Sequence, residues 1–357
     1  MKRFIRSAFT LVELLVVIAV IGLLLGMFLP FVGRGVREPS RRTGCSNNMR
    51  QLVLATLNYE SAHGHLPTAM GPLDEKYVTA GSSSQLSGFI SLLAFMEHND
   101  LLDEIIKSQT YGGVNFPPGP NPWTTGYEPY QQSINVLLCP SSNGNESEFG
   151  KTNYGFSIGD VARSIHKPQT ARGAFACGLT TNLNQDFPDG TSNTIAFLEF
   201  DVAEGRSTGG QYAIRQPESF FDDPSQCLKL ADEKASKLYS ENVTLSKLGR
   251  GSNWASGTAE STLANTILAP GSPSCAIGGK RAADGFYSAN SMHTAGSNVA
   301  YVDGSVHFIG YSIDAGDPSS PAPTQTQLAT EGFATPYGVW GALGARNDGR
   351  AIEFGDY

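Results

Sequence analysis

The residues best suited to chemistry near the C-terminus are His293, the segment Asp303-Gly304-Ser305 and His307. Two histidines and a carboxylate could bind zinc if three or four ligands converged on one point. A serine, a histidine and an aspartate could also form a nucleophilic triad, but no Gly-x-Ser-x-Gly turn surrounds Ser305. Because Asp-Gly is a frequent hairpin turn, we expect structural roles for these residues. We therefore predict that the protein is not an enzyme and has no metal or cofactor.

The informative residue at the N-terminus is Glu13, a carboxylate inside an apolar segment. This segment, Phe9–Leu29, would extend about 31 Å as a helix, close to the hydrocarbon thickness of a bilayer. Apolar residues cover all its sides, so no polar stripe is left for a soluble helix. A carboxylate is costly in hydrocarbon and needs a compensating partner. Cleavage between Ala8 and Phe9 would create an amine one helical turn from Glu13.

Basic residues flank the apolar segment, although the whole chain carries a net charge of −8. The acidic remainder argues against a nucleic-acid binder, which needs a basic surface. Lys2, Arg3 and Arg6 resemble the start of a secretory signal peptide, whose apolar run is only about 7–15 residues long. The run here is longer and no Ala-x-Ala site follows it. We expect the segment to remain in the mature protein.

The N-terminus resembles that of the type IV prepilin family. The shared pattern is a short basic leader, a small residue, Phe-Thr-Leu-Val-Glu and an apolar helix, with Ala8 where the family usually has Gly. The resemblance implies that prepilin peptidase cuts after Ala8 and methylates Phe9. It also implies that Glu13 sets the register between subunits, and that the body faces away from the cytoplasm.

The remainder of the chain predicts a helix followed by a strand-rich body. Glycines and prolines after Pro30 weaken the helix, with a break expected near Pro39. From Ser40 onward, one helical face carries Cys45, Met49, Leu52, Val53, Thr56 and Leu57. The segment Phe89–Lys107 predicts a second helix. The short apolar runs Ile134–Pro140 and Thr194–Phe200 predict strands.

The strongest local prediction is a hairpin over Asn298–Gly310. Asp303-Gly304 joins two alternating runs and favours a two-residue turn. In that register Tyr301 faces Val306, and Val299 faces Phe308. His307 should point away from Tyr301 and Val306. We expect His293 to hydrogen-bond to the hairpin.

A second resemblance extends over most of the chain. It is carried by RRTGCSNNMRQLVLATLNYESAHGHLP, SLLAFMEHNDLLDEI, INVLLCPSS, DGTSNTI from Asp189-Gly190, and YGVWGALGARNDG. It is also carried by His293, separated by nine residues from Asp303-Gly304. The chain thereby resembles a large bacterial family of unknown function that combines a prepilin-type leader with this C-terminal motif. The resemblance implies an anchored, pilin-like protein and brings no known activity.

Two further groups of residues have open assignments. The five cysteines are odd in number, and an exported body would permit one or two disulfides among Cys139, Cys177, Cys227 and Cys275. Cys45 is expected to pack as a small apolar side chain. The oxygen-rich segment 182–189 could bind calcium, but its spacing fits no EF-hand. A polar turn before the strand at Thr194 is the preferred interpretation of residues 189–193.

We therefore expect an α+β fold, in which a helix packs on an antiparallel sheet. The predicted parts are a leader (1–8), a membrane and assembly helix (9–29), a stalk helix (30–66) and a β-rich body (67–357). The expected function is a pilin-like or pseudopilin-like subunit of a type IV pilus or type II secretion-like assembly. It would span the bacterial inner membrane once, with prepilin peptidase and other pilin-like subunits as partners. The alternatives are a membrane-tethered extracytoplasmic binding module that does not polymerise, and an anchored hydrolase with a polar pocket around His293.

Overall fold

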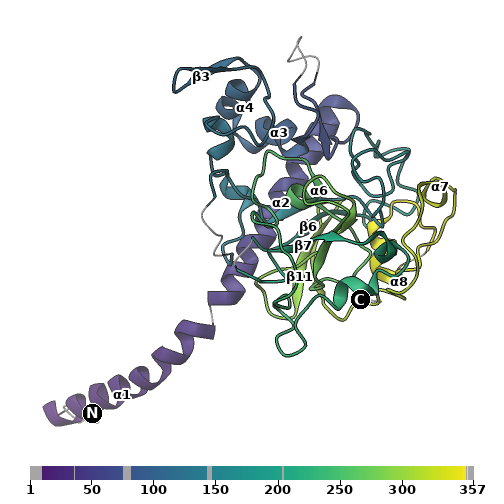
Figure 1. The fold of residues 1–357 in the computed structure, drawn as a ribbon. Coiled ribbons are helices and arrows are strands. Elements are labelled where there is room, and N and C mark those ends of the chain that lie inside the picture. The colour runs from purple at the N-terminus through teal and green to yellow at the C-terminus, as the bar shows by residue number, and fades with distance from the viewer. Residues whose placement is uncertain are drawn as a thin grey trace, which may run out of the picture.

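The computed structural model describes residues 10–35, 37–74, 82–142, 147–202, 205–350 and 352. A long N-terminal helix projects from the body, and the helix that follows it in the chain runs into the body beside a sheet (Figure 1). The fold is α+β, as predicted. Ala8 and Phe9, the predicted processing residues, lie outside the described residues.

Helix α1 spans Leu11–Gly35 and includes Pro30. Its first turn is closed by a reciprocal pair of hydrogen bonds between Thr10 and Glu13. The Glu13 carboxylate accepts from the Thr10 N–H at 2.9 Å, and Thr10 Oγ1 accepts from the Glu13 N–H at 3.3 Å. This capping box satisfies two N–H groups that the helix start leaves without partners. Within the described residues, no helix combines the length and the apolar character needed to cross a membrane.

Helix α2 spans Arg37–His63 and carries the buried face predicted from the sequence. Pro39 lies in its first turn, where a missing N–H is tolerated. The side chains at three- and four-residue spacing are buried, namely Cys45, Met49, Leu52, Val53 and Thr56, while Leu57 is half-buried. Gly64 ends the helix with a left-handed φ of +77° and donates its N–H to Glu60 O.

The main sheet has five strands in the order β12-β11-β6-β5-β8. In chain order these are β5 (Tyr154–Ser157), β6 (Ile195–Glu199), β8 (Leu263–Ala264), β11 (Gly296–Tyr301) and β12 (Val306–Gly310). Its pairs are antiparallel, as predicted, except for the parallel pair β5–β8. Helix α2 packs against β6, β11 and β12, so the predicted packing of this helix on a sheet is confirmed.

Smaller elements surround this sheet. A three-stranded sheet has the order β10-β9-β7, formed by Gly285–Phe286, Ser274–Ile277 and Tyr212–Gln216. Two ribbons pair β1 (Met70–Gly71) with β2 (Leu86–Ser87), and β3 (Gln109–Tyr111) with β4 (Val114–Phe116). The short helices are η2 (Glu128–Gln131), η4 (Glu218–Phe221), α5 (Ser225–Leu228), α6 (Ala259–Thr262), α7 (Gln325–Leu328) and α8 (Gly338–Gly344).

Two predicted elements differ from the structure. The helix predicted over Phe89–Lys107 is divided into α3 (Gly88–Leu92), η1 (Leu93–Met96) and α4 (Asn99–Ile105). Glu97 separates η1 from α4 because its φ of +65° lies outside the helical region. The strand predicted over Ile134–Pro140 is a single 3₁₀ turn, η3 (Asn135–Leu137), whereas the strand predicted over Thr194–Phe200 is present as β6.

The predicted hairpin is present, but its register is shifted by one residue. Ala300 pairs with Val306, and Asn298 pairs with Phe308, in place of Tyr301 and Val299. The loop contains an additional residue because Gly304, at φ +93°, donates to Tyr301 O and Tyr301 donates to Ser305 O. These bonds are typical of a type I turn followed by a left-handed glycine. Asp303 also accepts from the Ser305 N–H and Oγ.

Two disulfides are present, and one of them corrects the expectation for Cys45. Cys45 is bonded to Cys139, and Cys227 is bonded to Cys275. Burial on a helical face could not distinguish an apolar cysteine from a disulfide partner 94 residues away. Cys177 is free and buried, and burial raises the pKa of its thiol to about 12.

Candidate functional site

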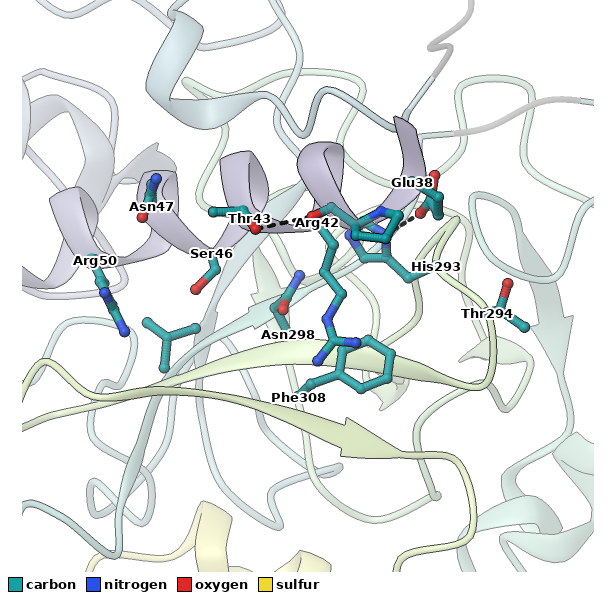
Figure 2. Close-up of a pocket in the computed structure, with 12 residues that line it drawn as sticks. Glu38, Arg42, Thr43, Ser46, Asn47, Arg50, His293, Thr294, Asn298 and Phe308 are labelled. Carbon is teal, nitrogen blue, oxygen red and sulfur yellow. Dashed lines mark hydrogen bonds and ion pairs between the residues drawn. The ribbon is translucent and has the colours of Figure 1, made fainter. Parts of the chain in front are cut away.

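A pocket of about 460 Å³ lies between the N-terminal half of α2 and the β11–β12 hairpin. Figure 2 shows Arg42, Ser46, Asn47 and Arg50 on the helix wall, facing strand residues across the pocket. The hairpin contributes side chains of alternating positions, Asn298, Val306 and Phe308. Those three share one face of the hairpin because of the observed register.

Two arginines give this pocket its cationic character. The guanidinium carbon of Arg42 lies 3.6 Å from the centre of the Phe308 ring, which holds the side chain across the pocket (Figure 2). Among the described residues, neither Arg42 nor Arg50 forms an ion pair. Two cations without carboxylate partners, next to serine and asparagine side chains, suit a carboxylate or phosphate ligand.

His293 is buried at one end of the pocket and joins α2 to the sheet. Its Nδ1 lies 2.6 Å from Glu38 Oε1, and its Nε2 lies 3.3 Å from Glu199 Oε1. Burial lowers the pKa of His293, but the contacts with Glu199 and Glu38 outweigh burial, so the net pKa is raised. The imidazole edge also packs against Phe308, at 6.3 Å between ring centres. His293 therefore contacts the hairpin through the Phe308 ring and not through the predicted hydrogen bond. The polar partners of its ring are Glu38 and Glu199.

Glu199 lies at the end of β6 with 1% of its surface exposed. Its Oε2 accepts hydrogen bonds from the Asn298 N–H and Nδ2, both at 2.9 Å. Its Oε1 is buried and faces His293 Nε2 at 3.3 Å. The sulfur of Cys139 lies 3.8 Å from His293 Nε2. The ligand atoms of Cys45, Cys139, Glu199 and His293 all lie within 4.8 Å of one another, so this group could hold a metal ion.

The other predicted motif residues lie together at the opposite end of β11. The Asp189 carboxylate accepts the backbone N–H groups of Asp348 and Gly349, and Gly190 turns the chain at φ +93°. The hairpin joins this corner because the Asp303 N–H donates to Thr191 O at 3.2 Å. The predicted polar turn at 189–193 is therefore hydrogen-bonded both to the hairpin and to residues 348–349, so three segments of the chain meet there. In the segment 182–189, the Asp186 carboxylate pairs with Arg346 and accepts the Asn182 N–H, while the Asp189 carboxylate has backbone N–H groups as partners.

The residues that could have formed a triad lie at opposite ends of β11. The six residues of this strand place its two ends roughly 17–20 Å apart. His293 precedes the strand, whereas Asp303 and Ser305 follow it and hydrogen-bond to each other. His307 pairs across the strands with Val299 and packs against Tyr301, so the predicted orientation away from Tyr301 is wrong. His293, Asp303 and His307 therefore do not form the zinc site considered from the sequence.

Sequence reasoning did not find the partners of His293. Glu38 and Cys45 are two helical turns apart on α2, a spacing that places both on one face. Glu199 was the more direct signal, because a carboxylate inside the apolar run TIAFLEF has to find a polar partner in the core. Neither the helical spacing nor the carboxylate in the apolar run identifies the residue that each side chain contacts.

Two family models match the chain. The model described as "Protein of unknown function (DUF1559)" matches residues 34–316, and the model described as "Prokaryotic N-terminal methylation motif" matches residues 3–29. No curated protein and no solved structure matches the chain. The first match includes the pocket, His293 and the hairpin, and the second includes Ala8, Phe9 and Glu13. The prepilin-type leader and the membership of a family of unknown function are confirmed, whereas the C-terminal His/Asp-Gly motif stays a prediction.

Proposed function

Because the chain belongs to the DUF1559 family of proteins of unknown function and carries a prokaryotic N-terminal methylation motif, we propose that it is a pilin-like structural subunit and not an enzyme. Prepilin peptidase removes residues 1–8 and methylates Phe9. Residues 9–29 then anchor the protein in the bacterial inner membrane, with the body in the periplasm or outside the cell. The same helix packs against other pilin-like subunits in a type IV pilus or type II secretion-like assembly.

The observation that carries this proposal is the uncovered apolar surface of α1. The described side chains from Leu11 to Leu24 are exposed, with Leu11 at 78% and Leu23 at 65%. The helix extends away from the body, which therefore does not cover it (Figure 1). A continuous apolar surface of this kind marks a site of contact with lipid or protein. Lipid before assembly and neighbouring α1 helices after assembly would supply that cover.

Glu13 gives the assembly its register. The carboxylate lies in the first turn of α1, where it accepts hydrogen bonds from Thr10. Cleavage after Ala8 leaves the amine of Phe9 four residues before it, and a cation near this carboxylate compensates its charge in a bilayer. In an assembly the amine of one subunit can pair with Glu13 of its neighbour, which fixes the axial offset between helices.

The mature N-terminus is the direct test of processing. We expect intact-mass analysis of the protein from native membranes to give a chain that begins with a singly methylated Phe9. Ala8→Arg should retain the leader because the cleavage site needs a small residue, and Ser7→Ala is the matched control. An intact Met1 or a cut distant from Ala8 in the unmodified protein would contradict the proposal.

A membrane-tethered binding module that does not polymerise is the second candidate, favoured by the cationic pocket between α2 and the hairpin. The two functions differ in the effect of Glu13→Gln on crosslinked complexes in native membranes. The assembly function predicts loss of the complexes formed through α1, with unchanged complexes for the body variant Glu97→Gln. A tethered module predicts the same complex size for both variants.

A further inference from the structure

Beyond the proposed function, we propose that the body has a second state in which four side chains bind one Zn²⁺ after reduction of a disulfide. The ligands are Cys45, Cys139, Glu199 and His293. In the oxidised state the two sulfurs are bonded to each other and cannot bind a metal. The disulfide joins the segments of Cys45 and Cys139, whereas the zinc ion would join these two segments to those of Glu199 and His293.

The positions of the ligand atoms fit a tetrahedral zinc site. Zinc binds cysteine sulfur at about 2.3 Å and histidine nitrogen or carboxylate oxygen at about 2.0–2.2 Å, so neighbouring ligand atoms lie about 3.3–3.8 Å apart. His293 Nε2 lies 3.3 Å from Glu199 Oε1 and 3.8 Å from Cys139 Sγ. All four ligand atoms lie within 4.8 Å of one another. Breaking the disulfide lets the sulfurs separate toward the distance that a shared metal requires.

The groups around the ligands have the arrangement expected of outer-shell partners. Histidines that bind metals commonly place their other ring nitrogen against a carboxylate, which fixes the orientation of the ring. Glu38 Oε1 occupies that position, 2.6 Å from His293 Nδ1, and leaves Nε2 directed at the cluster. Asn298 holds Glu199 through Oε2 alone. The other oxygen, Oε1, is buried and faces His293 Nε2 at 3.3 Å.

The ligand set favours zinc. Two thiolates, one imidazole and one carboxylate combine soft and hard donors, which suits Zn²⁺, whereas Cu⁺ favours sulfur ligands and Mg²⁺ or Ca²⁺ favour oxygen. All four ligands are buried, so the site is closed, as in structural zinc sites. We infer a structural role in which the metal fastens α2 to β6 when the disulfide is absent.

The conversion is balanced in electrons and protons. A dithiol supplies two electrons and two protons to the Cys45–Cys139 bond, which breaks to give two thiols, and the dithiol becomes a disulfide. Zinc then binds both sulfurs as thiolates and their protons pass to water, with a further proton from any imidazolium at His293. The zinc ion does not change its oxidation state.

The test is a Co²⁺ titration of the full chain in detergent micelles, in a Cys227→Ser/Cys275→Ser background that removes the other disulfide. After reduction by a dithiol and its removal under anaerobic conditions, we expect one equivalent of Co²⁺ with the visible bands of a tetrahedral thiolate complex. Zn²⁺ should displace the Co²⁺. The oxidised protein should give no such bands. A reduced, folded protein without tetrahedral Co²⁺ would overturn the proposal.

Variants then identify the ligands. His293→Ala and Glu199→Gln should weaken Co²⁺ binding at least about 10-fold, and the outer-shell variant Glu38→Gln about 10–100-fold. His307→Ala, on the neighbouring hairpin strand, is the matched control and should bind as the parent does. If the first three variants bind Co²⁺ as tightly as the parent, the ion is held elsewhere and the proposal is wrong. Glu38→Gln keeps all four ligands, so it supplies the comparison should a ligand variant fail to fold.

Discussion

Removing the Cys45–Cys139 disulfide should destabilise the body more than removing the second disulfide. The bond closes a loop of 94 residues, whereas Cys227–Cys275 closes one of 48. In the chain-entropy description, these lengths correspond to about 4.7 and about 4.1 kcal/mol of the free energy of unfolding. The first bond also joins α2 to the segment that follows η3, so its loss releases the helix that forms one wall of the pocket.

The assay is guanidinium unfolding of the full chain in micelles, without reductant and with a chelator present. The fluorescence of the buried Trp254 and Trp340 reports on the body. We expect Cys45→Ala/Cys139→Ala to lower the free energy of unfolding by about 4–5 kcal/mol, with Cys227→Ala/Cys275→Ala as the matched control. A loss below about 1 kcal/mol for the first pair, with a normal loss for the second, would refute the claim that the first disulfide fastens α2 in the folded protein.

Three further outcomes follow from groups buried in the body. Arg172→Met should cost about 3–5 kcal/mol in the free energy of unfolding, because it leaves the buried Asp160 carboxylate without its cation and Asp348 with Arg350 alone, and a loss under about 1 kcal/mol in urea unfolding would contradict this. His293→Gln should lower the melting temperature most below about pH 6.5, because the raised pKa of His293 stabilises the folded state there and this contribution disappears as the pH rises through the folded pKa. Melting curves at acidic and alkaline pH check this, with His98→Gln as the control, and a larger effect at alkaline pH would reverse the assigned sign. Cys177 should react with iodoacetamide only after unfolding, as mass spectrometry can show, because burial raises the pKa of its thiol to about 12; modification of the native protein would contradict its placement.

The parts of the fold that were predictable depend on local periodicity. The three- and four-residue spacing of Cys45, Met49 and Leu52 defines a buried helical face wherever the helix packs, and α2 has that face. The apolar run at Thr194–Phe200 likewise becomes β6. Residues 89–107 have helical spacing too, but Glu97 interrupts the helix through a backbone conformation that side-chain periodicity does not encode.

The pocket was not predictable from the sequence because the predicted hairpin register is wrong by one residue. Asp-Gly favours a two-residue turn, yet it also fits the longer loop observed here, in which Gly304 has a left-handed φ. A shift of one residue reverses the face of every side chain on a strand. The predicted register paired Phe308 with Val299, whereas the observed register places Phe308 beside Asn298, opposite α2. The cationic pocket exists only in the second arrangement.

The cluster around His293 depends on contacts that no local pattern contains. Its members come from α2, the segment after η3, β6 and the segment before β11, and only the complete fold brings them together. Glu38 and Cys45 lie on the helix that follows α1 in the chain, while Glu199 and His293 belong to the sheet side. A disulfide and a Glu38–His293 contact within two helical turns therefore add to the apolar packing that holds α2 on the body. Because the pocket has α2 as one wall and the hairpin as the other, the same contacts that hold this helix also fix the distance between Arg42 and Phe308.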